Sequence, residues 1–279
     1  MSPHKIGILH PGEMGISIAV SAQNSGNTLC WVSSGRSAAT RARAEKYALQ
    51  DLDTLNNLCA QCDAILSVCP PHAAEELAHQ VIACGFTGLY LDANAISPRR
   101  VYQIAQAMSS SGASYVDGGI IGGPAWKPNS TWLYLSGPRA QEAAEFFSAG
   151  PLVPHVLGDE VGKSSALKMC FSAYSKGTTA LLAAVLAAAE SLGIQDDLNR
   201  QWSHGNPNFP ANTAERVRGV TAKAWRFSGE MEEIAVTFQD AGLPGDFHIA
   251  AAEIYSRLAR FKDAPQLPPL EDVLAAVLH

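Results

Sequence analysis

The sequence lacks the features that would mark a membrane protein, a secreted protein or a nucleic-acid-binding protein. Its longest uncharged apolar stretch, Gly177 to Ala189, has 13 residues, whereas a helix needs about 20 to span a bilayer. Basic residues form no cluster and the formal net charge is -6, so nucleic acids and anionic membranes are poor partners. The first 15 residues show no signal-peptide pattern, and we therefore expect a cytoplasmic protein.

The cysteines also lack any pattern that indicates disulfides or a metal. Six of them are scattered through 279 residues, and without a secretion signal we interpret them as reduced thiols. Cys59 and Cys62 have the C-x-x-C spacing, and His72 and His79 follow. This order matches no zinc motif, and the cysteine pair precedes a strand instead of opening a helix. We predict no bound metal.

Short apolar runs alternate with helical patterns through the first half of the chain. The expected strands are 5–9, 28–33, 63–68, 88–92, 114–121, 131–136 and 152–157. This alternation predicts βαβ units and a mainly parallel, Rossmann-type sheet. After Leu157 strand signals nearly vanish. The sequence therefore predicts a dinucleotide-binding α/β domain over residues 1–161 and an all-helical domain over residues 162–279.

A long apolar segment, 158–192, joins the two predicted domains and is expected to form a single helix that starts near Val161 or Gly162. It contains no proline, and Gly193 is expected to end it. An unpaired lysine on an apolar helix is costly, so we interpret Lys168 as a group kept for chemistry. The alternative is that Lys168 reaches solvent from the edge of the helix. Spacings of three, four and four place one polar stripe on a single face: Ser165, Lys168, Ser172 and Lys176.

A glycine-containing turn follows the first predicted strand and opens the first predicted helix. Gly12 lets backbone amides approach a pyrophosphate, Gly15 lets the helix pack closely, and the helix N-terminus attracts the anion. The first glycine of the usual G-x-G-x-x-G pattern is His10 here, a residue that tolerates positive φ better than most. The alternative is a tight turn without a ligand. The predicted cofactor-binding residues in this turn are His10, Pro11, Gly12, Glu13 and Met14.

The end of the second predicted strand bears on the choice of cofactor. NAD enzymes usually carry an acid there that holds the ribose 2′-hydroxyl, but the segment 32–37 contains none. Ser33, Ser34 and Arg36 can instead bind a 2′-phosphate through charge-assisted hydrogen bonds, with Arg41 nearby. We therefore favour NADP(H) over NAD(H). The alternative is that Arg36 is only a solvated residue at the start of a helix.

Together, the glycine turn, the segment from Asp117 to Gly123 and the Lys168 helix resemble the β-hydroxyacid dehydrogenase superfamily. This group includes 3-hydroxyisobutyrate and 6-phosphogluconate dehydrogenases and the related imine reductases. The resemblance covers nearly the whole chain, and the helical half resembles a phosphogluconate-dehydrogenase-like branch of uncertain substrate. It implies an NAD(P)-dependent oxidoreductase that transfers hydride between nicotinamide and a small hydroxy acid or carbonyl compound.

The resemblance also implies roles for particular residues. Lys168 takes the position of the catalytic lysine, the general acid/base, with Ser172 in place of an asparagine one turn later. Asn94 and Ala95 lie in a loop similar to D-x-S-T-x-x-P beside the nicotinamide. Cys69 and Pro70 are expected to line the cofactor riboses.

The substrate loop departs from the pattern of the family. Ile121, Gly122 and Gly123 occupy the end of a segment that resembles D-A-P-V-S-G-G, and Ile121 replaces its serine. The retained Lys168 favours carbonyl–alcohol chemistry, whereas the altered Ile121 and Ser172 argue against the standard substrates. An imine reductase or reductive aminase, and a non-catalytic NADP-binding protein, remain alternatives.

Further residues are weaker candidates. The apolar second half of the long helix, 177–189, is expected to be covered by a second copy of the chain in a homodimer. The remaining candidates have structural alternatives of similar weight: Tyr174, Lys176, Asn206, Asn208, Glu232, Glu233 and Trp126.

Overall fold

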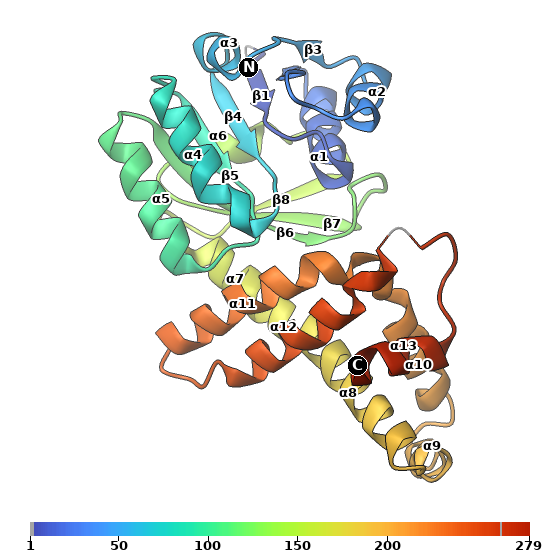
Figure 1. Cartoon of the computed structure of the whole chain (residues 1–279). Helices are drawn as coiled ribbons and strands as arrows, with labels where there is room; N and C mark the ends of the chain where they lie inside the picture. Colours follow the sequence, from blue (N-terminus) through green and yellow to red (C-terminus); the bar gives the residue numbers. More distant parts are fainter. Residues whose placement is uncertain (1–2, 263) are drawn as a thin grey trace. The chain divides into compact units, whose positions relative to one another are not determined.

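The computed structural model describes residues 3–262 and 264–279. The chain divides into two compact units, of which the first ends at Met169 and the second begins at Cys170. Sheet and flanking helices form the first unit, and helices form the second (Figure 1). Within the described residues, no helix is both long and apolar enough to cross a membrane.

The first unit is built on an eight-stranded sheet in the order β3-β2-β1-β4-β5-β6-β7-β8. Neighbouring strands are parallel except for β6 and β7, which are antiparallel. This confirms the predicted mainly parallel sheet. The strands are β1 (Lys5–Ile8), β2 (Thr28–Trp31), β3 (Gln50–Asp51), β4 (Ala64–Ser67), β5 (Leu89–Asp92), β6 (Ser114–Gly122), β7 (Thr131–Ser136) and β8 (Leu152–Val156).

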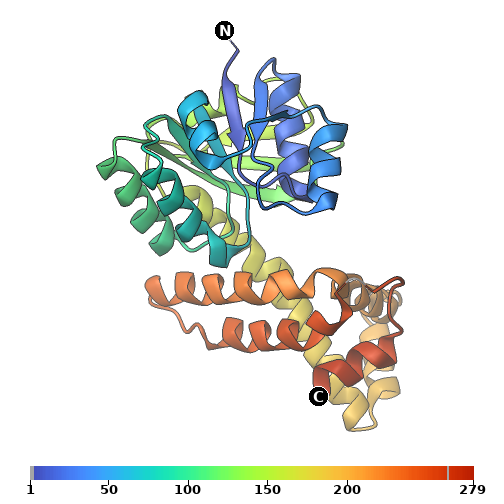
Figure 2. The ribbon, with the colours of Figure 1, turned by 45° about the horizontal axis from the view of Figure 1, so that its top comes forward.

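Both faces of this sheet are covered, and the covering helices are visible in Figure 2. Side chains along a strand alternate between faces, so Leu89 and Leu91 of β5 join one apolar cluster and Tyr90 joins the other. The first cluster includes α1 (Glu13–Asn24), α2 (Ala38–Lys46) and α6 (Ala140–Glu145). The second includes α3 (Leu55–Gln61), α4 (Ala74–Ala83) and α5 (Pro98–Ser110).

The short edge strand β3 is not among the strands expected from the sequence. Both β3 residues are exposed, so they carry no apolar period that would reveal a strand. Helix α3 follows, and Thr54 caps it by accepting a hydrogen bond from the Asn57 N–H at 3.3 Å. The antiparallel pairing of β7 was also not predicted.

The predicted long helix is present, with one interruption. It runs through α7 (Lys163–Ser172), a π-helical turn (Ala173–Gly177) and α8 (Thr178–Ser191). Gly193 follows with a φ of +67°, which glycine adopts at little cost. The boundary between the two compact units follows Met169, eight residues after the predicted boundary at residue 161. The first turns of α7 therefore belong to the sheet unit.

The second unit packs helices around α8. Ala183, Leu186 and Ala187 of α8 are buried, and α10, α12 and α13 of the same unit contact this helix. Much of the apolar surface of α8 is therefore covered within its own chain. The remaining helices are α9 (Gln195–Ser203), α10 (Phe209–Gly219), α11 (Ala224–Asp240), α12 (Asp246–Leu258) and α13 (Leu270–Leu278).

Candidate functional site

The glycine turn between β1 and α1 has the geometry of an anion cradle. A Cβ on Gly15 would lie 2.2 Å from the His10 carbonyl oxygen, so only glycine allows α1 to start there. A Cβ on Gly12 would meet nothing within 4 Å, which leaves open space beside the turn. No side chain caps the N-terminus of α1, so its first N–H groups can serve an anion. These features fit a dinucleotide pyrophosphate.

His10 occupies the first-glycine position as a neutral imidazole. Burial, assisted by the Arg36 cation, lowers its pKa to about 4. Its Nδ1 atom is buried and has no hydrogen-bond partner among the described residues. The turn therefore carries an available ring nitrogen but no histidine charge at neutral pH.

The segment after β2 carries three arginines, one in the loop and two on α2, and each donates to a main-chain carbonyl of the surrounding loops. Arg36 Nη2 donates to the Leu9 oxygen at 3.0 Å, and Arg41 Nη2 donates to the Ser33 oxygen at 2.7 Å. Arg43 Nη1 donates to the Pro11 oxygen at 3.0 Å. Sequence analysis missed Arg43, which lies on α2 two residues after Arg41.

An acid also lies at this end of the sheet, although none occurs in segment 32–37. Asp51 of β3 accepts hydrogen bonds from the N–H groups of Ser33 and Asp53 at 3.2 and 2.8 Å. Burial raises the pKa of Asp51, but these bonds and the Arg41 cation together lower it. The expectation that no acid stands nearby is thus corrected, because β3 brings Asp51 back to β2. Its charge is met by N–H groups and Arg41.

Asn94 joins the carboxyl ends of β4 and β5. Its Nδ2 donates to Ser67 Oγ at 3.0 Å, and its Oδ1 accepts from the Cys69 N–H at 2.6 Å. Its own N–H donates to Asp92 Oδ1 at 3.1 Å. The side chain is buried and holds the loops that carry Cys69, Pro70 and Ala95. Burial raises the pKa of the Cys69 thiol to about 12, so this cysteine is no nucleophile.

Asp117 anchors the start of α7 from the adjacent strand. Its Oδ1 accepts from Ser165 Oγ at 2.6 Å, and its Oδ2 accepts from the Ser165 N–H at 2.9 Å. Ser136 Oγ donates to Asp117 at 3.1 Å and accepts from the Ser164 N–H at 3.1 Å. A carboxylate at a helix N-terminus is electrostatically favourable. Ser165 of the polar stripe therefore serves this anchor.

Lys168 lies one turn further along α7, beside β6. A Cβ on Gly119 would be 2.7 Å from the Ser164 carbonyl oxygen and 3.2 Å from Lys168 Cβ. Gly119 thus lets the backbone of α7 lie directly against the strand that leads to the predicted substrate loop. The structure places Ile121 and Gly122 at the end of β6 itself and not in a loop, because both pair with β7. Ile121 is buried, whereas Gly122 and Gly123 are exposed. The lysine is partly buried.

The later stripe residues belong to the helical unit and differ from each other. Ser172 is buried, and its Oγ has no hydrogen-bond partner among the described residues. Lys176 forms an ion pair with Glu230 and lies 4.7 Å from the centre of the Phe227 ring. Lys176 is therefore a structural residue of its unit, while the Ser172 hydroxyl remains available.

The weaker candidates have local explanations. Asn206 Oδ1 accepts from the Asn208 N–H at 3.1 Å, a turn before α10. Glu233 is buried and Glu232 is exposed, both on α11, and Tyr174 is exposed. Trp126 stacks on Tyr47 with ring centres 5.2 Å apart.

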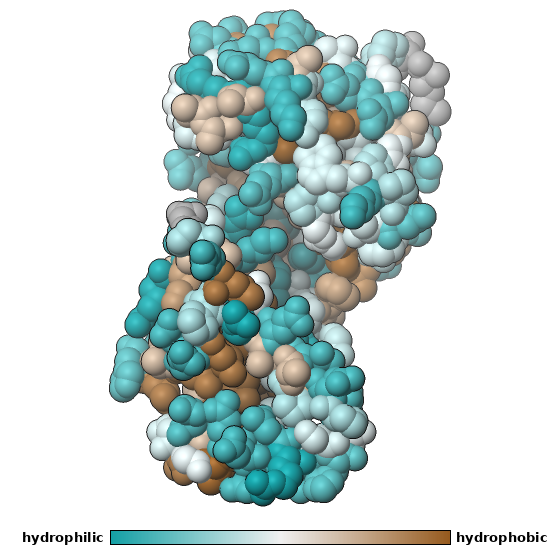
Figure 3. Space-filling model, turned by 90° about the vertical axis from the view of Figure 1, so that its right-hand side faces the viewer, coloured by the Kyte–Doolittle hydropathy of each residue, from teal (hydrophilic) through white to brown (hydrophobic). Residues whose placement is uncertain are grey.

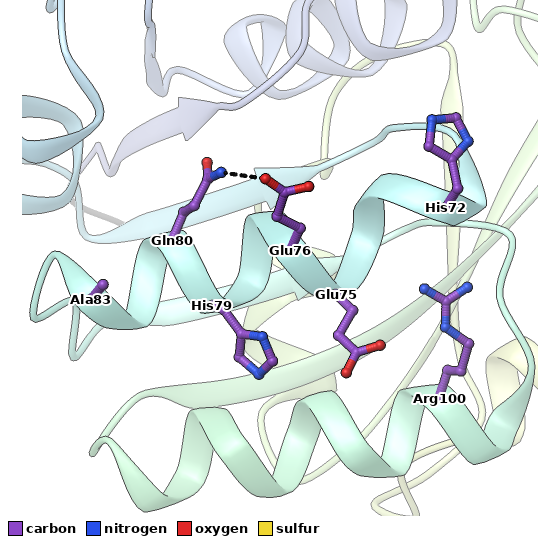
Figure 4. A pocket seen from close by; sticks show the side chains of 7 residues that line it. All are labelled: His72, Glu75, Glu76, His79, Gln80, Ala83 and Arg100. Atoms are coloured by element: carbon purple, nitrogen blue, oxygen red, sulfur yellow. Dashed lines mark hydrogen bonds between the residues drawn. The ribbon is translucent and has the colours of Figure 1, made fainter.

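A separate cleft of about 550 Å³ lies between α4 and α5 and contains none of the predicted site residues. Figure 4 shows Glu75 and His79 directed toward α5, with His72 and Arg100 at one end. No group of three or more metal-ligating side chains occurs in the described part of the chain. All six cysteines are free.

Comparisons with known proteins agree with this architecture. Residues 5–148 match the NAD binding domain of 6-phosphogluconate dehydrogenase, and residues 189–258 match a domain of unknown function, DUF1932. An uncharacterized 28.5 kDa protein of Methanothermus fervidus is 29% identical over 164 residues, which are 59% of this chain. The match spans 62% of the length of that relative.

Two solved structures share the fold over nearly their whole length. The 3-hydroxyisobutyrate dehydrogenase of Mycobacterium tuberculosis is 17% identical with a TM-score of 0.71, covering 100% of both chains. A reductive aminase of Aspergillus terreus, with NADPH4, cyclohexanone and allyl amine, is 16% identical with a TM-score of 0.57, covering 98% of this chain and 99% of its own.

The sheet topology and the glycine turn define a dinucleotide-binding protein of the Rossmann class with an all-helical second unit. The matched NAD-binding model covers more than half of the chain. The chain therefore belongs to the family of proteins that share the NAD binding domain of 6-phosphogluconate dehydrogenase.

Proposed function

We propose that this protein is an NADP(H)-dependent oxidoreductase of the β-hydroxyacid dehydrogenase type. It transfers hydride between nicotinamide and a small hydroxy acid or carbonyl compound. The observation that carries the proposal is the placement of Lys168: the Asp117–Ser165 anchor and the close approach at Gly119 fix its helix against β6. Such fixation is what a general acid/base requires.

The cofactor would be held by the loops at the carboxyl edge of the sheet. The turn His10–Met14 would bind the pyrophosphate, and Asn94 would position Cys69, Pro70 and Ala95 along the riboses and nicotinamide. Ser33, Ser34 and Arg36 would bind the 2′-phosphate, which supports NADP(H) over NAD(H). When bound, the nicotinamide supplies or accepts the hydride.

Lys168 would exchange a proton with the reacting oxygen and stabilise the charge that develops there. The Ser172 hydroxyl, one turn on, would add a hydrogen bond to the substrate. Ile121, Gly122 and Gly123, at the end of β6, would line the substrate, where the glycines leave room and Ile121 offers an apolar contact. The homodimeric state and the cytoplasmic location belong to the same proposal.

Reduction of C=N bonds is the second candidate function. Ile121 offers no hydroxyl where the family pattern has serine, and Ser172 offers a shorter polar group than asparagine. Both changes favour a less polar substrate than a hydroxy acid, such as an imine.

Oxidation of NADPH against keto acids, aldehydes and cyclic imines tests the proposal. Lys168→Ala should reduce carbonyl turnover by about a thousandfold or more while NADPH affinity stays unchanged. Lys163→Ala is the matched control, because Lys163 is an exposed residue of the same helix and pairs with the exposed Glu160. It should retain full activity.

Three results would change the assignment. Turnover of imines alone, insensitive to Lys168→Ala, would establish the second candidate instead. Tight NADPH binding without turnover of any substrate class would indicate a non-catalytic NADP-binding protein. Absence of NADPH and NADH binding would overturn the proposal altogether.

A further inference from the structure

The arginines around the glycine turn have three different anchor points. Arg41 is tied to the loop after β2: its Nη2 donates to the Ser33 oxygen at 2.7 Å and its Nε to the Arg36 oxygen at 3.4 Å. Arg36 Nη2 donates to the Leu9 oxygen at 3.0 Å, directly after β1. Arg43 donates instead to the Pro11 oxygen at 3.0 Å. Pro11 directly precedes Gly12, which caps α1. Arg43 therefore lies at the helix N-terminus where a pyrophosphate would sit, not at the end of the strand.

The charge around this helix N-terminus gives a reason for an additional cation. Glu13 is an exposed acid in the first turn of α1, and it opposes an anion at the same helix end. His10 supplies no compensating charge, because its pKa is lowered to about 4 by burial and by Arg36. Arg43 is half-buried and uses one of its five N–H donors on Pro11, so its fork keeps donors for a phosphate oxygen.

We propose that Arg43 is a cofactor-binding residue that contacts the pyrophosphate of the dinucleotide, while Arg36 and Arg41 serve the 2′-phosphate. This inference rests on the proposed function for the presence of a dinucleotide. It adds a specific consequence. Arg43 contributes equally to NADPH and NADH affinity, because both cofactors carry the pyrophosphate. Arg41 contributes to NADPH affinity alone.

Binding of two nucleotide fragments separates these roles without any turnover. ADP carries the diphosphate but no 2′-phosphate, whereas 2′-AMP carries the 2′-phosphate but no diphosphate. Calorimetry on the full chain measures the binding affinity of each nucleotide. Arg43→Gln should weaken the binding of ADP about tenfold and change the affinity for 2′-AMP by no more than about twofold. Arg41→Gln should show the opposite pattern. Lys46→Gln removes the same charge from an exposed position of the same helix and should alter neither fragment more than about twofold.

Other outcomes contradict the inference. If Arg43→Gln leaves ADP affinity unchanged, or weakens 2′-AMP as much as ADP, Arg43 is not a pyrophosphate contact. Thermal melting of each variant verifies that the fold is intact. Should Arg43→Gln fail to fold, Arg43→Lys keeps the charge but loses the fork. If Arg43→Lys lowers the affinity for ADP a few fold and leaves the affinity for 2′-AMP unchanged, the inference is supported. Wild-type affinity of this variant for both nucleotides contradicts it.

Failure of the inference is distinguishable from failure of the proposed function. If the wild-type chain binds NADPH, ADP and 2′-AMP but turns over no substrate, the inference can still hold. If the wild-type chain binds none of the three nucleotides, the proposed cofactor and this inference both fall.

Discussion

At the scale of single residues, side chains that the sequence places on one helix face have different partners in the structure. Ser165, Ser172 and Lys176 share one face of one helical run, yet Ser165 is bonded to Asp117 and Lys176 is paired with Glu230. Ser172 keeps a buried hydroxyl without a partner among the described residues. A buried, unpaired hydroxyl is costly, so its retention is expected where a ligand completes the hydrogen bond.

Gly12 offers a test of the cofactor cradle that is independent of folding. Its φ of -69° suits any residue, and an added Cβ would meet nothing within 4 Å. Gly12→Ala should therefore leave the melting temperature unchanged while weakening NADPH binding about tenfold or more, because the methyl group occupies the space of the pyrophosphate. Fluorescence titration with NADPH measures the loss. Unchanged affinity would show that no phosphate approaches this turn.

Asp92 should make stability depend on pH. Burial, with the nearby Asp117 carboxylate, raises its pKa to about 7. Between its ordinary value near 4 and pH 7, the folded protein holds a proton that the unfolded chain has lost, so stability falls as pH rises through this window. Asp92→Asn removes this dependence.

Between pH 4 and pH 7, the free energy of unfolding of the Asp92→Asn variant should therefore rise relative to that of the wild type by up to about 4 kcal/mol. Urea unfolding at several pH values measures this difference. Asp159→Asn, at an exposed position, is the control and should track the wild type. A constant difference for Asp92→Asn across the window would contradict the expected protonation.

At the scale of elements, the contact between α7 and β6 places the proposed chemistry. Two independent features hold it: the Asp117 anchor at the helix start and the absence of a side chain at Gly119. The Asp117 anchor holds the N-terminal end of α7, and Gly119 lets the side of the helix lie close to β6. Together they fix where the helix starts and how near it lies to the strand. Lys168 follows within one turn of Ser165.

Gly119→Ala tests this arrangement. The new methyl group would lie 2.7 Å from the Ser164 carbonyl oxygen, which forces α7 away from the strand. We expect a loss of about 1–3 kcal/mol in the free energy of unfolding and a fall in turnover greater than the change in NADPH affinity. Gly219→Ala is the matched control, because a Cβ there meets nothing within 4 Å and Gly219 lies outside the proposed site. Equal behaviour of the two variants would contradict the close-packing argument.

At the scale of the whole molecule, the exposed apolar side chains are unevenly shared between the units. Of the 15 large hydrophobic residues that are exposed in the described part of the chain, 11 belong to residues 170–279. Figure 3 shows brown areas gathered on the helical unit. Apolar patches of this kind mark association surfaces, which supports the proposed homodimer even though α8 is largely covered by its own unit.

Leu181 of α8 is 48% exposed and provides the test of the dimer. Leu181→Glu should shift the protein from dimer to monomer in light scattering at micromolar concentration, because a charge at an apolar interface is not compensated. Val156→Glu, the same change at an exposed position of the sheet unit, should leave the dimer intact. A monodisperse monomer of the wild type would remove the homodimer from the proposal.

Local sequence was sufficient for most of the fold. Short apolar runs predicted β1, β2 and β4–β8 within a few residues, because central strands covered on both faces bury nearly every side chain. The glycine turn and the long helix ended by Gly193 were equally visible, since a tight approach and a helix stop each depend on neighbouring residues. The roles assigned to Lys168, Ser172 and Asn94 stay predictions.

Only the tertiary structure decided which distant groups meet. Asp51 joins Ser33 through the exposed two-residue strand β3, Arg43 reaches Pro11 across 32 positions, and Asp117 binds Ser165 across 48. None of these pairs has a local signature, because a hydrogen bond between two elements depends on how strands are ordered and helices packed. The sequence by itself determined a dinucleotide-binding fold with a lysine on its long helix. The packing of the chain decided what surrounds the cofactor turn and what holds that helix in place.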